Sequence, residues 1–156
     1  MANVPTSGHS ISNLAEREFS SGMKFINGDT FLARITPCLE NGKTAFVDFL
    51  KKDEVGFGST EFIVLRPKKL PDYFAYLLCR FDDFRAFATQ SMTGTSGRQR
   101  VQTDRLATYK MAMPFNIELI SDKLEKILTP MVNKISSNSI ENQKLAQLRD
   151  SFRAFL

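Results

Sequence analysis

A period-two alternation of apolar and polar side chains begins at Asp29 and stops at Pro37. Successive side chains of an extended strand point to opposite faces, so this pattern predicts a strand with two distinct faces. Two more short strands are predicted over residues 44–50 and 61–66, with a glycine-bearing turn over residues 55–59 between them. The apolar face of the first strand carries Phe31, Ala33 and Ile35.

The segment before these strands, residues 1–28, is rich in serine, glycine and asparagine. Such residues favour turns and local hydrogen bonds to the backbone over regular structure. We therefore expect an irregular lead-in, with a short helical turn around residues 13–18.

Pro71 and Asp72 open a helical pattern, because proline suits the first turn of a helix and an acid suits its positive end. Apolar residues then recur at steps of three or four, and this stripe is expected to pack on the sheet. The helix is expected to end before Thr93, and a further short strand is predicted over residues 109–113. The stripe consists of Phe74, Leu77, Leu78, Phe81, Phe84 and Ala88.

Residues 115–156 contain no glycine and follow a helical period. One helix is predicted over residues 117–129, after which Pro130 is expected either to kink it or to begin a second helix. Asparagine is costly in an ordinary core but sets register in coiled coils, so Asn138 and Asn142 favour pairing with a partner helix. Together with them, the heptad-like seam comprises Met131, Ile135, Leu145, Arg149, Phe152 and Leu156.

These patterns predict a fold that contains both helices and strands, of the α/β class in the broad sense and mixed α+β in its arrangement. A domain with short strands is expected over residues 1–114, and a long coiled-coil-forming helical arm over residues 115–156. At 156 residues the chain can bury about two-thirds of its unfolded surface. A lone amphipathic helix of this length has little domain to pack against, so the arm is expected to serve in dimerisation or as a spacer.

Composition narrows the function only slightly. The formal charge of +4 and the isoelectric point of about 9.2 mildly favour an anionic partner such as nucleic acid. Two cysteines, one histidine and the lack of a glycine-rich phosphate loop argue against a metal or a bound cofactor, and we expect neither. The N-terminus does not resemble a signal peptide, and no apolar run reaches the ~18 residues of a membrane span. We therefore expect a cytoplasmic protein.

Candidate catalytic residues are few. Asp29, Glu40 and Lys43 weakly resemble the acidic–Glu–Lys cluster of metal-dependent nucleases, in which Glu and Lys lie two apart on one strand. Here they lie three apart across an Asn-Gly turn, which favours solvated charges instead. Ser/His/Asp catalysis would need His9, which we expect at the surface. The chain is predicted to be non-catalytic, with a metal-dependent nuclease as a remote alternative.

The loop over residues 94–100 is the best candidate for contact with nucleic acid. Gly94 and Gly97 permit a tight backbone, and the residues between them offer hydroxyl donors. Arg98 and Arg100 suit guanine, and Gln99 suits adenine, in bidentate contacts in the major groove. Composition alone nevertheless favours an ordinary surface turn, in which Arg100 would pair with a carboxylate and Gln99 would cap the turn.

Four blocks of the chain carry a family resemblance. They are NGDTFLARITPCLENGK at residues 27–43, GSTEF at residues 58–62, MTGTSGRQRV at residues 92–101, and a tail around residues 138–150. In this order they resemble conserved stretches of the DNA-specificity (S) subunits of type I restriction–modification systems.

The resemblance implies a target recognition domain joined to a long helix, in a subunit that usually holds two of each with the helices antiparallel. It implies binding to double-stranded DNA and to modification subunits, which supply S-adenosylmethionine-dependent methylation. This chain is too short for two recognition domains, and we expect its domain to be incomplete at the N-terminus. A homodimer through the helix would replace the missing half.

The resemblance and the loop chemistry together single out two sets of residues. Residues shared by subunits with different targets are expected to hold the fold or touch phosphate, and base readout is expected elsewhere, for example over residues 51–57. The predicted DNA contacts are Arg34, Asn41, Lys43, Thr95, Ser96, Arg98, Gln99 and Arg100. The predicted dimer or partner contacts are Met131, Ile135, Asn138, Asn142, Leu145, Phe152 and Leu156. An open alternative is a coiled-coil fragment that binds modification or specificity subunits without binding DNA.

Overall fold

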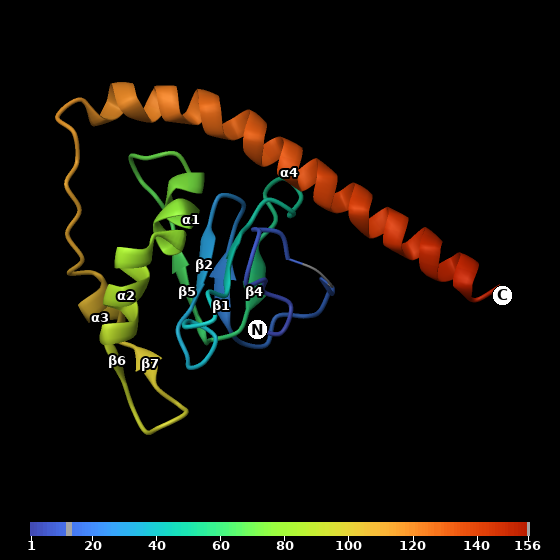
Figure 1. Cartoon of the computed structure of the whole chain (residues 1–156), viewed down its shortest axis with the longest axis horizontal. Coiled ribbons are helices and arrows are strands. Elements are labelled where there is room, and N and C mark those ends of the chain that lie inside the picture. The colour runs from blue at the N-terminus through green and yellow to red at the C-terminus, as the bar shows by residue number, and fades with distance from the viewer. Residues whose placement is uncertain (12–13, 156) are drawn as a thin grey trace.

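The computed structural model describes residues 1–11 and 14–155, and its architecture is the mixed α+β fold predicted from the sequence. A small domain is crossed by a long helix whose C-terminal part extends away from it (Figure 1). The strands are β1 (Met23–Phe25), β2 (Thr30–Ala33), β3 (Thr44–Phe46), β4 (Gly56–Gly58), β5 (Phe62–Leu65), β6 (Met92–Thr93) and β7 (Arg100–Val101). The helices are α1 (Tyr73–Arg80), α2 (Asp82–Gln90), α3 (Thr103–Leu106) and α4 (Ile117–Arg153).

The domain is built around an antiparallel sheet with the strand order β3-β2-β5. All four residues of β2 are buried, so both faces of this strand are covered. Phe31 belongs to one core cluster with Phe25 and Phe62, and Leu32 belongs to a second with Cys79. The alternation predicted from the sequence is confirmed, and it supplies side chains to two cores.

The N-terminal segment is irregular, as predicted, but it is not peripheral. It lies along β3, where Phe46 donates its backbone N–H to the carbonyl of His9 at 3.1 Å. Val4 is buried in the same cluster as Phe31. β3 ends at Phe46, before the predicted residue 50, and the Asn27 side chain then bonds the backbone of Leu50 through both its oxygen and its nitrogen. A side chain thus replaces the strand ladder at this point.

The single helix predicted after Pro71 is two helices. The backbone at Phe81 is extended, with ψ of 128°, and separates α1 from α2. The break shifts the buried face of α1 to Ala75, Tyr76 and Cys79, so Leu77 and Phe81 of the predicted stripe are exposed. In α2, Phe84 and Ala88 are buried as predicted.

The prediction of a turn over residues 55–59 is wrong, because Gly56–Gly58 forms strand β4, which pairs with β1. β1 itself lies inside the predicted irregular lead-in. A side chain at Gly56 would place its Cβ 2.1 Å from the Phe25 ring, so the glycine permits close approach rather than a turn.

Three further predictions of local structure also need correction. Residues 14–18 form no helix, and position 13 lies outside the described residues. Residues 109–113 form no strand and instead belong to the connection from α3 to α4, the orange-yellow segment of Figure 1. α4 runs unbroken through Pro130, so no second helix begins there.

α4 packs on the domain through a narrow face. Val132 is buried against Phe46 and Tyr76, and it is the residue of α4 that joins a core cluster. The predicted seam lies on the face next to this contact, and Met131, Ile135, Leu145 and Phe152 are exposed, whereas Leu156 lies outside the described residues. No helix within residues 1–11 and 14–155 is long and apolar enough to cross a membrane.

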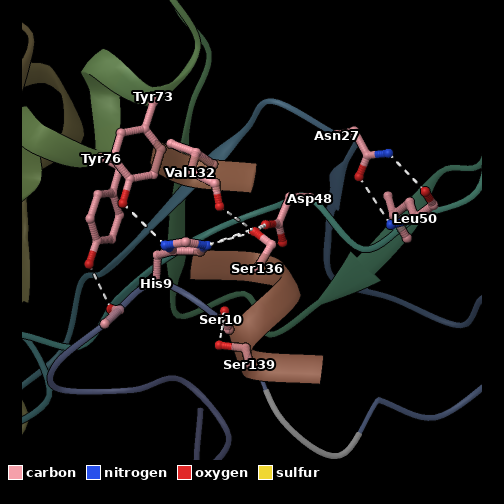
Figure 2. Close-up of polar contacts among 11 residues, drawn as sticks. His9, Ser10, Asn27, Asp48, Leu50, Tyr73, Tyr76, Val132, Ser136 and Ser139 are labelled. Carbon is pink, nitrogen blue, oxygen red and sulfur yellow. Dashed lines mark hydrogen bonds and ion pairs between the residues drawn. The ribbon is translucent and has the colours of Figure 1, made fainter. Parts of the chain in front are cut away.

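His9 joins α4 to the domain and is not the surface residue predicted from the sequence, since only 1% of it is exposed. Its Nδ1 lies 3.1 Å from the Tyr73 hydroxyl, and its Nε2 lies 3.2 Å from both Asp48 and Ser136 of α4 (Figure 2). Next to it, the Ser10 hydroxyl donates to that of Ser139 at 3.0 Å. A polar network therefore holds the helix to the domain, although the sequence led us to expect little domain for it to pack against.

The proton positions in this network follow from Tyr73. Burial raises the pKa of the Tyr73 phenol to about 12, so the phenol keeps its proton and can donate to Nδ1. When Tyr73 donates to Nδ1, the proton on Nε2 points toward Asp48, which also accepts from Ser136. Burial acts to raise the pKa of Asp48, but the hydrogen bonds from His9 and Ser136 outweigh it and lower that pKa.

Replacing Asp48 with asparagine tests this network. The lowered pKa means that ionised Asp48 stabilises the fold above the unfolded value of about 4, and that this contribution is lost as pH falls through the folded pKa. Asp48→Asn should lower the free energy of unfolding by about 1–3 kcal/mol at pH 7, and the difference from the unmodified chain should shrink below pH 4. Urea denaturation at several pH values measures both effects.

Asp150→Asn is the matched control, because Asp150 also has a pKa lowered by its hydrogen bond from Arg149 but lies fully in solvent. It should leave stability nearly unchanged at every pH. Equal effects of the two substitutions at pH 7 would contradict a stabilising role for the His9 network.

Candidate nucleic-acid interface

The β6–β7 hairpin projects from the end of the domain remote from α4 (Figure 1). Its base is fixed to the strand segment that follows β2. Val101 donates its backbone N–H to the Arg34 carbonyl at 2.8 Å, and Thr36 donates to the Gln99 carbonyl at 3.0 Å. Ile35 and Arg100 form a β-bridge between these two bonds. The first and third resembling blocks of the sequence therefore meet in space.

Arg100 is held by a carboxylate at the base of the hairpin. Its Nε lies 3.0 Å from both oxygens of Glu61, and its Nη2 donates to Oε1 at 2.7 Å. The hydrogen bond from Arg100 lowers the pKa of the Glu61 carboxyl, and that carboxylate raises the pKa of Arg100. The pairing of Arg100 with a carboxylate, which the sequence left open, is thus observed.

Arg34 lies behind this ion pair and is only partly exposed. Its Nη2 donates to the Val101 carbonyl at 3.3 Å, and its charge contributes to lowering the pKa of Glu61. Together with Gln99, whose carbonyl also accepts a weak bond from the Thr36 hydroxyl, it holds the hairpin to the sheet. These contacts favour a supporting role for Arg34 and Gln99.

The tip of the hairpin is exposed, and it carries Thr95, Ser96 and Arg98. Gly94 has φ of +128°, and a Cβ there would lie 3.0 Å from the Arg98 carbonyl, so the turn depends on glycine. The Arg98 side chain makes no hydrogen bond or ion pair with any other residue that the structure describes. It is an exposed and available cation of the loop.

Asn41 and Lys43 lie in the turn that follows β2, and their side chains make no hydrogen bond or ion pair with the described residues of the hairpin. Lys43 donates its ammonium to the Met1 carbonyl at 3.1 Å, whereas the Asn41 side chain is exposed. The turn is held from the other side by Arg85, which donates to the Glu40 carbonyl at 3.0 Å. The predicted DNA contacts thus fall into two groups, one around Arg100 and one in this turn.

The residues of the nuclease alternative bind to separate partners. Asp29 is fully buried and accepts two bonds from Arg66, at 2.6 and 2.7 Å, while Lys43 contacts Met1. Among the described residues, no three His, Cys, Asp or Glu side chains gather in a way that would hold a metal ion. Nothing in this arrangement favours metal-dependent cleavage.

His9, Asp48 and Ser136 do not have the geometry of a nucleophilic triad. In such a triad the acid and the serine contact opposite nitrogens of the imidazole. Here both contact Nε2, and the nitrogen opposite is occupied by Tyr73. The group is also enclosed by Phe46 and the tyrosines, so its role is structural.

A hollow of about 1010 Å³ lies on another part of the domain, between residues 14–22 and residues 49–60. It includes Lys51 and Phe57 of the segment suggested above for base readout, and the Phe57 ring packs edge-on against Phe19.

Sequence reasoning missed two residues that organise the molecule. Glu61 lies inside the resembling block at residues 58–62, and its place at the start of β5 was the available signal. His9 gave no such signal, because its partners lie 39 to 127 positions away.

No family model matches the chain. It is 35% identical over 96 residues to the specificity subunit of the EcoEI type I restriction enzyme of Escherichia coli, which covers 60% of this chain and 16% of the relative. It is 42% identical over 79 residues to the EcoAI specificity subunit of the same organism, which covers 49% of this chain and 13% of the relative. The chain thus spans about one-sixth or less of the length of these relatives, and it is related to part of the specificity subunits of type I restriction enzymes.

Proposed function

We propose that this chain is a DNA target recognition module of a type I restriction–modification system and has no catalytic role of its own. The observation that carries the proposal is the sequence match to two specificity subunits. The exposed hairpin tip supports it, because two glycines and an unpaired arginine suit close approach to a phosphate backbone.

We propose that the two segments of the chain have different roles. Residues 1–114 contact DNA through the β6–β7 hairpin, and residues 115–156 assemble with a second helix. In Figure 1 the hairpin and α4 lie at opposite ends of the domain, so the two roles do not compete for surface. Modification subunits are the expected further partners, and the module directs them to the DNA site.

Within the hairpin, we assign phosphate contact to Arg98 and a more constrained role to Arg100. Arg98 is exposed at the tip, whereas Glu61 occupies one edge of the Arg100 guanidinium. An unpaired arginine can bind the phosphates of any duplex, because each such contact releases counterions whatever the sequence. An arginine held in one orientation can bind only acceptors placed in a matching geometry.

The first test combines selection from random duplexes with the substitution Arg98→Ala. The unmodified chain should enrich a sequence, and Arg98→Ala should weaken the enriched and a scrambled duplex about equally. The slope of log affinity against log salt should fall by roughly one. Fluorescence anisotropy at two salt concentrations measures both.

Lys126→Ala on α4 removes one charge far from the hairpin and serves as the control. A loss confined to the enriched duplex would reassign Arg98 to base readout. If the unmodified chain binds no duplex at low salt but still joins a modification subunit, the interaction-protein alternative holds instead.

A second helix is the proposed cover for the exposed seam of α4. Phe152 is 71% exposed, and Met131, Leu145 and Leu148 are each more than half exposed. Apolar side chains at heptad spacing bury this surface by pairing, and a second copy of this chain offers the same seam. We propose an antiparallel homodimer, in which each copy replaces the second recognition module of a full subunit.

Replacing both Leu145 and Phe152 with glutamate should therefore give a monomer whose domain stays folded, because neither residue contacts the domain core. Light scattering at tens of micromolar measures the mass. In the same selection, the dimer should enrich an inverted repeat with a non-specific gap, and the variant only a half-site.

Gln143→Glu with Gln147→Glu is the matched control, since it adds the same charge on the outer face of the same helix. This control should remain dimeric. A monomeric unmodified chain at tens of micromolar would refute the homodimer and leave DNA recognition to be judged by its own test.

A further inference from the structure

We propose that Glu61 is a positioning residue for DNA recognition, which orients Arg100 so that its guanidinium discriminates between sequences. The inference rests on the proposed function, and it assigns to an acidic residue a role at a surface that would contact a polyanion. It is carried by the geometry of one ion pair and its surroundings.

Glu61 is itself firmly placed. Its backbone N–H donates to the Ser59 hydroxyl at 3.1 Å, and its carbonyl accepts the backbone N–H of Arg34 at 3.0 Å. The carboxylate therefore projects from the start of β5 at a fixed point beside the hairpin. Because both of its oxygens contact Arg100, the guanidinium plane is fixed as well.

The ion pair leaves one edge of Arg100 available. Guanidinium has five N–H donors, and Glu61 engages only the one on Nε and one of those on Nη2. The Arg100 side chain is 43% exposed and that of Glu61 is 27% exposed, so the pair lies at the surface with the arginine outermost. The N–H groups of Nη1 and the second N–H of Nη2 are thus free to donate side by side to DNA acceptors from a constrained orientation.

Attachment of the hairpin does not explain the pair. The backbone bonds of Val101 and Thr36, at 2.8 and 3.0 Å, already fix the base of the hairpin to the sheet. What these backbone bonds do not fix is the direction of the Arg100 guanidinium, which the two oxygens of Glu61 do fix. A bidentate pair at this position therefore contributes mainly orientation.

The charge of Glu61 has a second consequence. It offsets the positive charge of Arg100 and acts on Arg34 as well, and so reduces attraction to any phosphate backbone. An arginine held by a carboxylate binds phosphate less tightly, and it binds base acceptors only where their positions match its fixed orientation. This combination suits a module that must distinguish one site from many.

The test compares Glu61→Gln with the unmodified chain on two probes, the duplex enriched by selection and a scrambled version of it. Glutamine keeps the shape and removes the charge. Binding to the scrambled duplex should become equal or tighter, with a salt slope steeper by up to about one. The enriched-to-scrambled affinity ratio should fall about fivefold to a hundredfold, the range for one lost bidentate base contact.

Two further variants separate positioning from charge and from folding. Glu141→Gln, on an exposed part of α4, changes the net charge equally and should leave the ratio unchanged. Glu61→Asp retains the carboxylate and should restore part of the ratio. Arg100→Lys should lower the ratio as Glu61→Gln does, and the double substitution should lower it little further, since both remove the same arrangement.

The outcomes are distinct. An unchanged ratio in folded Glu61→Gln, or a lower melting temperature with an unchanged ratio, would overturn the inference and leave the proposed function standing. Failure of the unmodified chain to bind any duplex would overturn both. A lower ratio together with rescue by aspartate supports the positioning role.

Discussion

The burial of β2 on both faces is the constraint on which the rest of the structure depends. This four-residue strand lies between β3 and β5, and its side chains enter two different cores. Its two ends carry the other fixed points. At its start, buried Asp29 binds Arg66, and after its end the segment through Thr36 holds the β6–β7 hairpin. The proposed DNA-contacting loop is therefore positioned by the most buried element of the domain, as precise recognition requires.

The attachment of α4 obeys a different logic. A helix that packed on the domain through a broad apolar face would bury the apolar side chains that a second helix could contact. α4 instead contacts the domain through Val132 and through hydrogen bonds between hydroxyl groups and with the His9 imidazole. Hydrogen bonds impose direction, so a narrow contact can define the angle of a long helix. Small side chains at Ser136 and Ser139 let the helix approach His9 and Ser10, and the neighbouring face stays open to a second helix.

Local pattern predicted β2, β5, the end of α2 and the C-terminal helical arm, because each has a clear periodicity along the sequence. It failed where a residue's role depends on a distant neighbour. The sequence predicts a turn at Gly56, because the Phe25 ring, which leaves no room for a side chain there, comes thirty-one positions earlier and is not part of the local pattern. His9 was placed at the surface because its enclosing tyrosines lie on α1. Among the candidate site residues, Arg34, Gln99 and Arg100 do come together, yet the pairing of Arg100 with Glu61 could be identified only from the fold.

The arginines show why net charge is a poor guide to binding in this chain. Arg66 neutralises Asp29, Arg100 is paired with Glu61, and Arg80 donates to the carbonyls of Thr6, Gly8, Gly42 and Thr44. These three arginines are therefore committed to holding the fold in place, and Arg98 is a cation of the hairpin whose guanidinium is free. Affinity for DNA grows with the number of phosphates neutralised, so one module with few free cations is expected to bind weakly. Linking two modules through paired α4 helices would raise the affinity by effective concentration without any new contact, which makes assembly of the arm as important to recognition as the hairpin itself.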